Sequence, residues 1–172
     1  AMIERAKARG IPNFHIFGEV ANDGDVGDLA LHTRVHQLPS VLDFGFRAAV
    51  QHTVAGEKGP DVLAAMFDRD ALYEGGAEAA LRLPTFISNH DHGRFSADVR
   101  KAFPKARGDE VLARVKVGHA MLLLLRGVPT IYAGDEQGFV SDGNDQDARE
   151  DMFPSKVTIY NDNRLLGTRK TT

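Results

Sequence analysis

The chain divides into short apolar runs separated by segments with helical spacing. The short runs are rich in aromatic and β-branched residues, which favour strands. They are residues 14–20, 40–44, 83–91 and 130–134. The segments in which apolar residues recur with helical spacing are 2–9, 47–55, 61–67 and 110–126. Strands that alternate with helices predict an α/β fold with a parallel βα series.

The longest predicted helix covers residues 110–126. Val111, Val115 and Leu122 share one apolar face, and the last turns are apolar all round. A helix that is apolar on every side is usually buried, so we expect this one to be well covered by the rest of the fold.

Polar stretches set the limits of this series. Residues 21–28 are rich in Gly and Asp and residues 141–151 are acidic, so both are predicted loops. Residues 161–172 are polar and are predicted to form a frayed tail. We therefore expect one structural unit over residues 2–160, followed by the tail.

Composition excludes several classes of protein. Lys+Arg number 21 and Asp+Glu 24, so the net charge is −3 and no basic excess indicates a nucleic-acid binder. Hydrophobic residues make up 42%, which is a globular composition and excludes disordered chains. Without cysteine the chain has no disulfide, thiolate zinc site or cysteine nucleophile. This leaves the compartment open, because many exported bacterial enzymes also lack cysteine.

No segment predicts a membrane span or a leader. The longest apolar run, residues 120–125, is far shorter than a membrane-spanning helix. Residues 1–6 are charged and do not have the pattern of a signal peptide. The localisation is therefore not predicted, and export of a bacterial parent enzyme stays one alternative.

Each predicted strand ends in polar or charged residues. Glu19, Asp43 and Asp91 close the first three strands, and Asp135 follows the fourth. In parallel α/β folds the carboxyl ends of the strands share one rim, where functional residues gather. Two carboxylates on such a rim suit glycoside hydrolysis, so Glu19 and Asp91 are the predicted catalytic pair. The alternative is that these carboxylates cap helices or are solvated loop charges.

Several histidines raise the question of a metal site. His90 and His92 flank Asp91 at a strand end, where alternate side chains share one face, and His32 and His36 would form a second pair on a helix. The other strand ends carry carboxylates and no histidine, so we predict no metal ligands. The acidic residues 142–147 lack the glycine and glutamate that an EF-hand calcium loop requires.

Four segments together resemble one enzyme family. Residues 86–91, Phe-Ile-Ser-Asn-His-Asp, followed by Arg94, resemble the signature at the end of the seventh barrel strand in the alpha-amylase family of glycoside hydrolases. Residues 14–20, 40–44 and 127–136 are similar to the fifth, sixth and eighth strands of that family. The resemblance extends over residues 2–168.

The resemblance implies a (β/α)8 barrel that cleaves or transfers α-glucosidic bonds with retention of configuration. Glu19 matches the general acid/base, and Asp91 matches the carboxylate that stabilises the transition state. His90 and Asn89 match the substrate-binding site, together with Arg94, the basic residue of the motif, in a supporting role. The implied partner is an α-glucan or malto-oligosaccharide. No cofactor is implied, because the family's calcium site lies largely outside this segment.

One part of the family pattern is absent from the sequence. The family nucleophile is an aspartate on the fourth strand, and no segment here matches it. A whole barrel needs about 250 residues, so the 172 residues predict a partial TIM barrel of about four strands, five to eight, with flanking helices. A retaining reaction needs a nucleophile near the acid/base, so we expect little or no hydrolysis by the chain alone.

Besides a fragment of a glycoside hydrolase, two other interpretations of the sequence remain open. The first is a non-catalytic half-barrel that binds malto-oligosaccharides or self-associates. A half-barrel favours self-association into a homo-oligomer, because it leaves strand edges and apolar faces uncovered. The second is a metal-dependent barrel hydrolase, which metal analysis of the purified protein would distinguish.

Overall fold

The computed structural model describes residues 1–141, 143–153, 156–157, 164–168 and 170. The helices are α1 (Met2–Ala8), α2 (Val26–Arg34), α3 (Phe44–Val54), α4 (Asp61–Asp68), α5 (Gly76–Ala80), α6 (Phe95–Ala102) and α7 (Gly108–Leu124). The strands are β1 (Pro84–Thr85) and β2 (Val128–Pro129), and short 3-10 turns are η1 (Asp70–Leu72), η2 (Asp135–Gln137) and η3 (Asp145–Ala148). Among these residues, no helix is both long and apolar enough to cross a bilayer.

The four apolar runs lie next to one another in sequence order, and every pairing between them is parallel. The pairs are Gly18 with Val41, Asp43 with Thr85, and β1 with β2. The ladder continues past β2, where the Thr130 N–H donates to the Thr85 carbonyl at 2.7 Å. This arrangement confirms the predicted fold class, a parallel βα series that forms part of a barrel.

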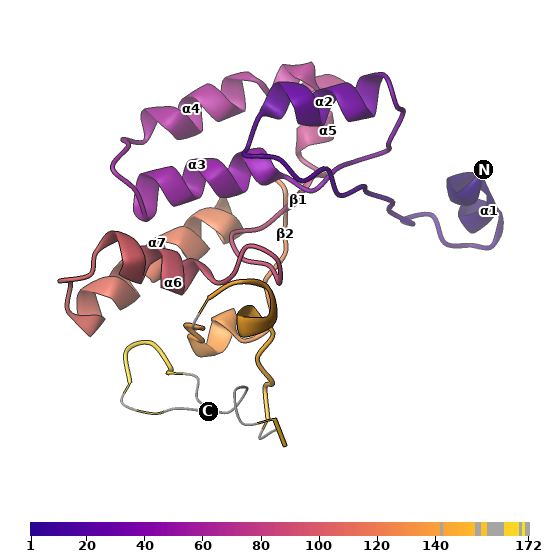
Figure 1. Ribbon diagram of the computed structural model, residues 1–172. Coiled ribbons are helices and arrows are strands. Elements are labelled where there is room, and N and C mark those ends of the chain that lie inside the picture. Colours follow the sequence, from indigo (N-terminus) through magenta and orange to yellow (C-terminus); the bar gives the residue numbers. More distant parts are fainter. Residues whose placement is uncertain (142, 154–155, 158–163, 169, 171–172) are drawn as a thin grey trace.

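The strands themselves are much shorter than predicted. Residues 14–20 do not form a strand and pair only through Gly18, while Phe17 is 49% exposed. Residues 130–134 also fall outside β2. Both runs lie at an edge of the ladder, so each has a neighbouring strand on one side only. A strand that is paired on one side only is less stable than a strand between two neighbours. Figure 1 shows α1 and the segment after it extending away from the body of the molecule.

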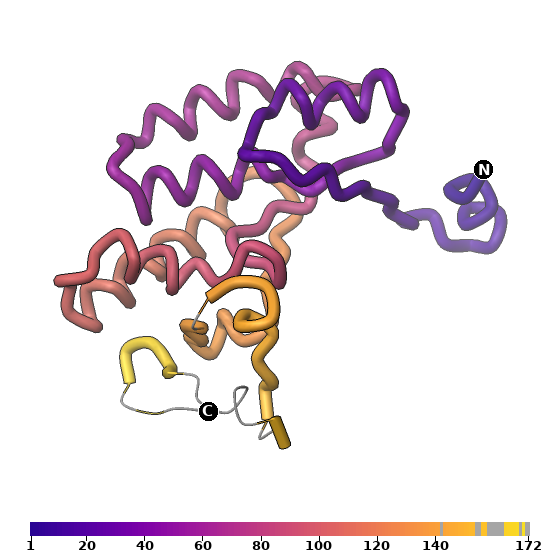
Figure 2. Tube along the Cα trace, viewed as in Figure 1, coloured from indigo at the N-terminus to yellow at the C-terminus, as the bar shows by residue number. Residues whose placement is uncertain are grey.

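Helices make up most of the body. The predicted helices at 47–55 and 61–67 are confirmed as α3 and α4, whereas α2, α5 and α6 were not predicted. Helix α3 begins earlier than expected because the Asp43 side chain accepts a hydrogen bond from the Phe46 N–H at 2.8 Å and caps the helix. The tube in Figure 2 shows α2–α5 grouped at one end and α6–α7 beside them, with the short strands between.

Helix α7 confirms its predicted span and part of its predicted burial. It packs against α3 and α6, and at Gly118 an added Cβ would lie 2.3 Å from the Phe95 ring, so glycine permits this close approach. Leu122 is buried, but Leu124 is 82% exposed and Leu123 is exposed as well. The expectation of good coverage therefore holds for the face of Val111, Val115 and Leu122 and fails in the last turn.

The described part of the C-terminal segment packs on the body. The Leu166 N–H donates to the Gly138 carbonyl at 2.7 Å, and Leu165 bridges Phe139 in antiparallel fashion. Leu166 is buried, so residues 164–168 are not frayed as predicted. Residues 158–163 lie outside the described residues, and so does Asp142 of the acidic loop.

Candidate functional site

The two predicted catalytic carboxylates lie on the same rim of the molecule. Glu19 follows the Gly18 bridge and is exposed, and Asp91 follows β1 and is also exposed. Both carboxylates bear on the pKa of His92. Burial and the nearby Arg47 cation lower the pKa of His92, and the carboxylates of Asp91 and Glu19 oppose that shift. Their common rim follows from the parallel bridges, Gly18 with Val41 and Asp43 with Thr85, which align the ends of these two runs on one side of the ladder.

A tight turn over residues 89–93 presents His90 and Asp91. The Gly93 N–H donates to the Asn89 carbonyl at 3.0 Å, and Gly93 adopts a φ of 80°, which favours glycine. The Asn89 Oδ1 accepts hydrogen bonds from the N–H groups of Asp91 at 3.2 Å and His92 at 2.7 Å. The side-chain oxygen of Asn89 is therefore engaged in shaping the turn, which is a different task from the predicted contact with substrate.

Asp91 is part of an open chain of charges. Its Oδ1 lies 3.4 Å from His90 Nε2 and 3.5 Å from Arg149 Nη2, and Arg149 also bonds to Asp145 at 2.9 Å. These side chains are roughly half exposed. Their polar atoms are accessible, so a hydroxylated ligand could replace the water around them.

Arg94 occupies a different environment from its neighbours in the motif. Its side chain is 1% exposed, and its guanidinium donates to Asp135 at 2.7 Å and to Glu150 at 2.6 Å. It also lies over the rings of Tyr132 and Phe139, at 4.6 and 5.1 Å from their centroids. These contacts agree with the supporting role expected for Arg94, while a contact with substrate stays a prediction.

The residues that follow β2 complete this buried network. The second oxygen of Asp135 lies 3.8 Å from His119 Nε2 on α7, and Glu136 accepts a hydrogen bond from the Gly134 N–H at 2.9 Å. The Asp135 side chain is buried and, through Arg94, holds the segment after β2 against the turn that carries Asp91. Glu136 is exposed and closes its own local turn at Gly134.

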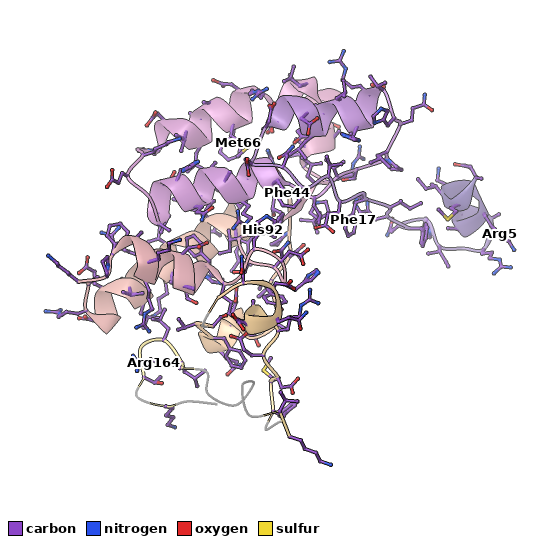
Figure 3. The ribbon with its side chains drawn as sticks, in the orientation of Figure 1. Arg5, Phe17, Phe44, Met66, His92 and Arg164 are labelled. Carbon is purple, nitrogen blue, oxygen red and sulfur yellow. The ribbon has the colours of Figure 1, made fainter. Side chains whose placement is uncertain are left out.

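The two histidines beside Asp91 turn toward different partners. His90 Nε2 faces Asp91, whereas His92 Nδ1 lies 3.2 Å from Asn89 Oδ1 and the His92 ring packs edge-on against Phe44 at 5.3 Å. Figure 3 shows His92 and Phe44 side by side in the middle of the molecule. Across the described ranges, no three His, Cys, Asp or Glu side chains are close enough together to hold a metal ion.

A polar cavity of about 730 Å³ adjoins the turn. Its lining includes His92, Asp98, Lys101, Asn144 and Arg164. None of Glu19, His90 or Asp91 lines it. The candidate site is therefore the open rim and not this cavity.

Comparison with known proteins decides the family. The family model described as "Alpha amylase, catalytic domain" matches residues 1–165. The chain belongs to the alpha-amylase catalytic-domain family. An alpha-amylase of Streptomyces lividans is 36% identical over 166 residues, which is 96% of this chain and 18% of that protein. A cyclomaltodextrin glucanotransferase of Niallia circulans is 30% identical over 148 residues, which is 84% of this chain and 18% of that protein.

Solved structures agree with the family and the fold. An Anoxybacillus alpha-amylase superposes with a TM-score of 0.69 at 25% identity, covering 91% of this chain and 32% of that one. The alpha-amylase of Geobacillus thermoleovorans, solved in complex with acarbose, gives a TM-score of 0.67 at 23% identity over 88% of this chain and 33% of that one. The chain thus spans about a third of the solved amylase chains and 18% of the curated relatives.

Two residues of this alpha-amylase-family site were not singled out from the sequence. Arg149 bonds to Asp91 from 58 positions away, and Glu150 bonds to Arg94 from 56 positions away. Neither residue was given a role, because the charged run at 149–151 is equally typical of a solvated loop. Their roles depend on tertiary contacts that no local pattern specifies.

Proposed function

We propose that this chain supplies the acid/base and the transition-state-stabilising carboxylate of a retaining enzyme that acts on the α-glucosidic bonds of starch-like glucans. Glu19 is the proposed acid/base, and Asp91 is the proposed stabiliser. The observation that carries the proposal is that both carboxylates are exposed and follow runs of one parallel ladder, whose carboxyl ends share a rim. Membership of the alpha-amylase family supports the reaction class.

Each side chain of the rim has a distinct task in the proposed reaction. Glu19 protonates the leaving glycosidic oxygen, and Asp91 stabilises the positive charge that develops on the sugar ring. His90, beside Asp91, donates a hydrogen bond to a sugar hydroxyl. Asn89 and Arg94 hold the turn in place without touching substrate. The reaction uses no cofactor, and its nucleophile is a carboxylate that this sequence does not contain.

The chain alone is therefore expected to lack hydrolytic activity. A retaining mechanism needs a nucleophile about 5 Å from the acid/base carboxyl group, and no acidic residue of this sequence matches it. The test is hydrolysis of soluble starch and of a chromogenic malto-oligosaccharide, with Glu19→Gln purified in parallel. We expect neither protein to turn over substrate. Robust turnover that disappears in Glu19→Gln would show that the chain has a nucleophile of its own.

Binding without turnover is the second candidate function. The half-exposed charges of His90, Asp91 and Arg149 favour it, because they offer several hydrogen-bonding groups in one place. Titration of maltoheptaose followed by NMR should shift signals of residues 89–93 in the chain and less so in Asp91→Asn. If no signal moves, the isolated rim does not retain sugar.

Self-association is the third property that we infer for this half-barrel. Phe14 and Phe17 are exposed at one edge of the strand ladder, and Leu124 and Val128 are exposed at the other. Apolar residues at both open edges favour pairing with a second copy. Light scattering should give a mass above that of one chain, and a clean monomer would count against it.

A further inference from the structure

A pair of histidines at the C-terminal end of α2, His32 in its last turn and His36 just after it, is not explained by the proposed reaction. His32 Nδ1 and His36 Nδ1 lie 3.0 Å apart, and their ring centroids lie 4.7 Å apart with an interplanar angle of 73°. His36 is exposed and His32 is half-buried, so both rings can be reached from solvent. Helix α2 lies at the surface of the helical end of the molecule (Figure 1), away from α6 and α7.

The backbone after α2 holds this pair together. The helix ends at Arg34, and Gln37 adopts the left-handed conformation with a φ of 55°, which is uncommon for a residue other than glycine. The reversal lets the Leu38 N–H donate to the His32 carbonyl at 3.1 Å. His36 is thereby folded back over the last turn of the helix, with its Nδ1 directed at His32.

We propose that His32 and His36 form a two-histidine site for a late first-row divalent transition metal ion, best suited to Ni²⁺ or Cu²⁺. Imidazole nitrogens bind such ions at about 2.0–2.1 Å, so two nitrogens at right angles around one ion lie about 2.8–3.0 Å apart. The observed 3.0 Å matches that separation. Two nitrogens of a tetrahedral site would be about 3.3–3.4 Å apart at the same bond lengths, which makes Zn²⁺ a poorer fit.

The chemistry of binding follows from the tautomers of the two rings. In the metal-free protein one Nδ1–H donates to the other Nδ1, so one ring carries its proton on Nδ1. Coordination needs both Nδ1 lone pairs, and the proton of that ring moves to its Nε2 through solvent. Two neutral rings then bind the ion with no net release of protons, and two water ligands of the ion are displaced.

The rest of the coordination sphere is open. Within the described part of the chain, no third His, Cys, Asp or Glu lies close enough to complete a site. Water therefore fills the remaining positions, which suits the square-planar or octahedral geometry of Cu²⁺ and Ni²⁺. Ca²⁺ and Mg²⁺ prefer oxygen ligands and are not expected to bind here.

A metal at this position would also stabilise the turn after α2. Leu38 belongs to that turn, and its side chain packs so closely on Gly18 that an added Cβ there would lie 2.6 Å from Leu38 Cδ1. Gly18 precedes Glu19. The metal site would thus stabilise the backbone next to the proposed acid/base without touching it.

The test is a calorimetric titration of the tag-free chain with NiCl₂, repeated with His32→Ala and His36→Ala. His52→Ala is the matched control, because His52 is an exposed histidine in the last turn of α3. We expect one saturable site per chain in wild type and in His52→Ala. Loss of an outer-shell partner alone costs a metal site about 10- to 100-fold in affinity. His32→Ala and His36→Ala each remove a direct ligand, so each should weaken Ni²⁺ binding by at least that factor.

A second readout separates metal binding from loss of structure. NiCl₂ should raise the melting temperature of wild type and of His52→Ala, and it should leave that of His32→Ala unchanged, while CaCl₂ should affect none of them. Circular dichroism checks that each variant is folded. Saturable binding that survives in both His32→Ala and His36→Ala, or its absence in wild type, would overturn the proposal and leave only a hydrogen-bonded histidine pair.

Discussion

Two buried arginines each join two carboxylates, but they stabilise different regions of the molecule. Arg126 is paired with Asp43 and Asp70, and Arg94 is paired with Asp135 and Glu150. Each guanidinium is at most 9% exposed and joins two carboxylates that are distant in the sequence. The difference lies in the elements that carry the carboxylates.

The partners of Arg126 belong to the helical body. Asp43 caps α3, and Asp70 belongs to η1 and binds the guanidinium with both oxygens, at 2.6 and 2.7 Å. Burial would lower the pKa of Arg126, but the bonds to Asp70 and Asp43 outweigh it, so the pKa is raised. Burial raises the pKa of Asp70, and Arg126 only partly opposes that shift. This arginine joins the end of α7 to α3 and η1.

The partners of Arg94 belong to segments without long helices. Asp135 starts η2 and Glu150 follows η3, so the guanidinium joins the turn at 89–93 to the segment after β2. A segment of this kind can open locally while the rest of the protein stays folded. The Arg126 network therefore supports the whole helical body, whereas the Arg94 network supports the rim of the candidate site.

The largest expected effect is that of Arg126→Met. Removal of the arginine leaves Asp43 and Asp70 buried without a counter-charge, and breaking a buried pair in this way costs about 3–5 kcal/mol. We expect the free energy of unfolding in urea, followed by circular dichroism, to fall by that amount. The fall should be global, because the partners belong to α3 and η1.

A matched control tests the cause of this loss. Adding Asp43→Asn and Asp70→Asn to Arg126→Met removes the uncompensated charges and should recover part of the stability. If the triple variant is no more stable than the single one, the loss reflects the contact of the guanidinium with the Phe67 ring and not the uncompensated carboxylates.

The second effect is that of Arg94→Met. Glu150 lies on a segment that can turn out to water, so we expect a smaller loss of about 1–3 kcal/mol. Hydrogen exchange should show faster exchange at residues 89–93 and 135–150, with α3 protected as in wild type. Glu150→Gln is the control and should reproduce the loosening in milder form. Equal loss of protection in α3 would contradict the division into two networks.

The elements could be predicted only where their determinants are local. Helices α3 and α7 follow from apolar spacing, but the first turn of α2 was assigned to a loop because its cap, Asp25, lies in a stretch rich in Gly and Asp. The Asp25 side chain accepts from the Gly27 N–H at 2.9 Å, so the cap was present in the sequence and overlooked. Strand lengths depend on neighbouring strands, which explains why the runs at 14–20 and 130–134 were predicted too long.

The same division applies to the candidate site. Glu19 and Asp91 were predicted as a pair because strand ends meet at one rim, whatever the rest of the fold does, and their catalytic roles stay a prediction. The supporting network could not, because Arg94 is 41 residues from Asp135, and Arg126 is 83 residues from Asp43. Asp43 itself looked like a rim carboxylate, and the structure shows that it is a helix cap bound to Arg126.

A third pair, Arg47 with Asp98, gives an intermediate case. The two groups are 3.9 Å apart, and burial raises the pKa of Asp98 above 3.8 more than Arg47 lowers it. A carboxyl with a raised folded-state pKa adds stability at low pH that is lost as the pH rises through that pKa. Asp98→Asn has no carboxyl group to ionise, so it does not lose stability in this way. The free energy of unfolding of the variant, relative to that of wild type, should rise by about 1 kcal/mol or less from acidic to neutral pH.

The readout for Asp98→Asn is the pH dependence and not the stability at one pH. Urea unfolding of both proteins should give a difference that grows in favour of the variant as the pH rises above the usual Asp value. The pKa of Arg47 is lowered mainly by burial, so the unpaired arginine costs the same at every pH below its titration. A difference that is constant with pH would mean that Asp98 does not titrate abnormally.

The smallest effect is expected for Arg149→Ala. Arg149 also joins two carboxylates, Asp91 and Asp145, but it is 40% exposed, so water and salt screen both pairs. Its removal should change the free energy of unfolding by less than about 1 kcal/mol, and urea unfolding at low and high salt should give the same small value. A loss as large as that of Arg94→Met would mean that two carboxylate partners suffice to stabilise the rim. The expected contrast instead identifies burial of the guanidinium as the property that makes such a network stabilising.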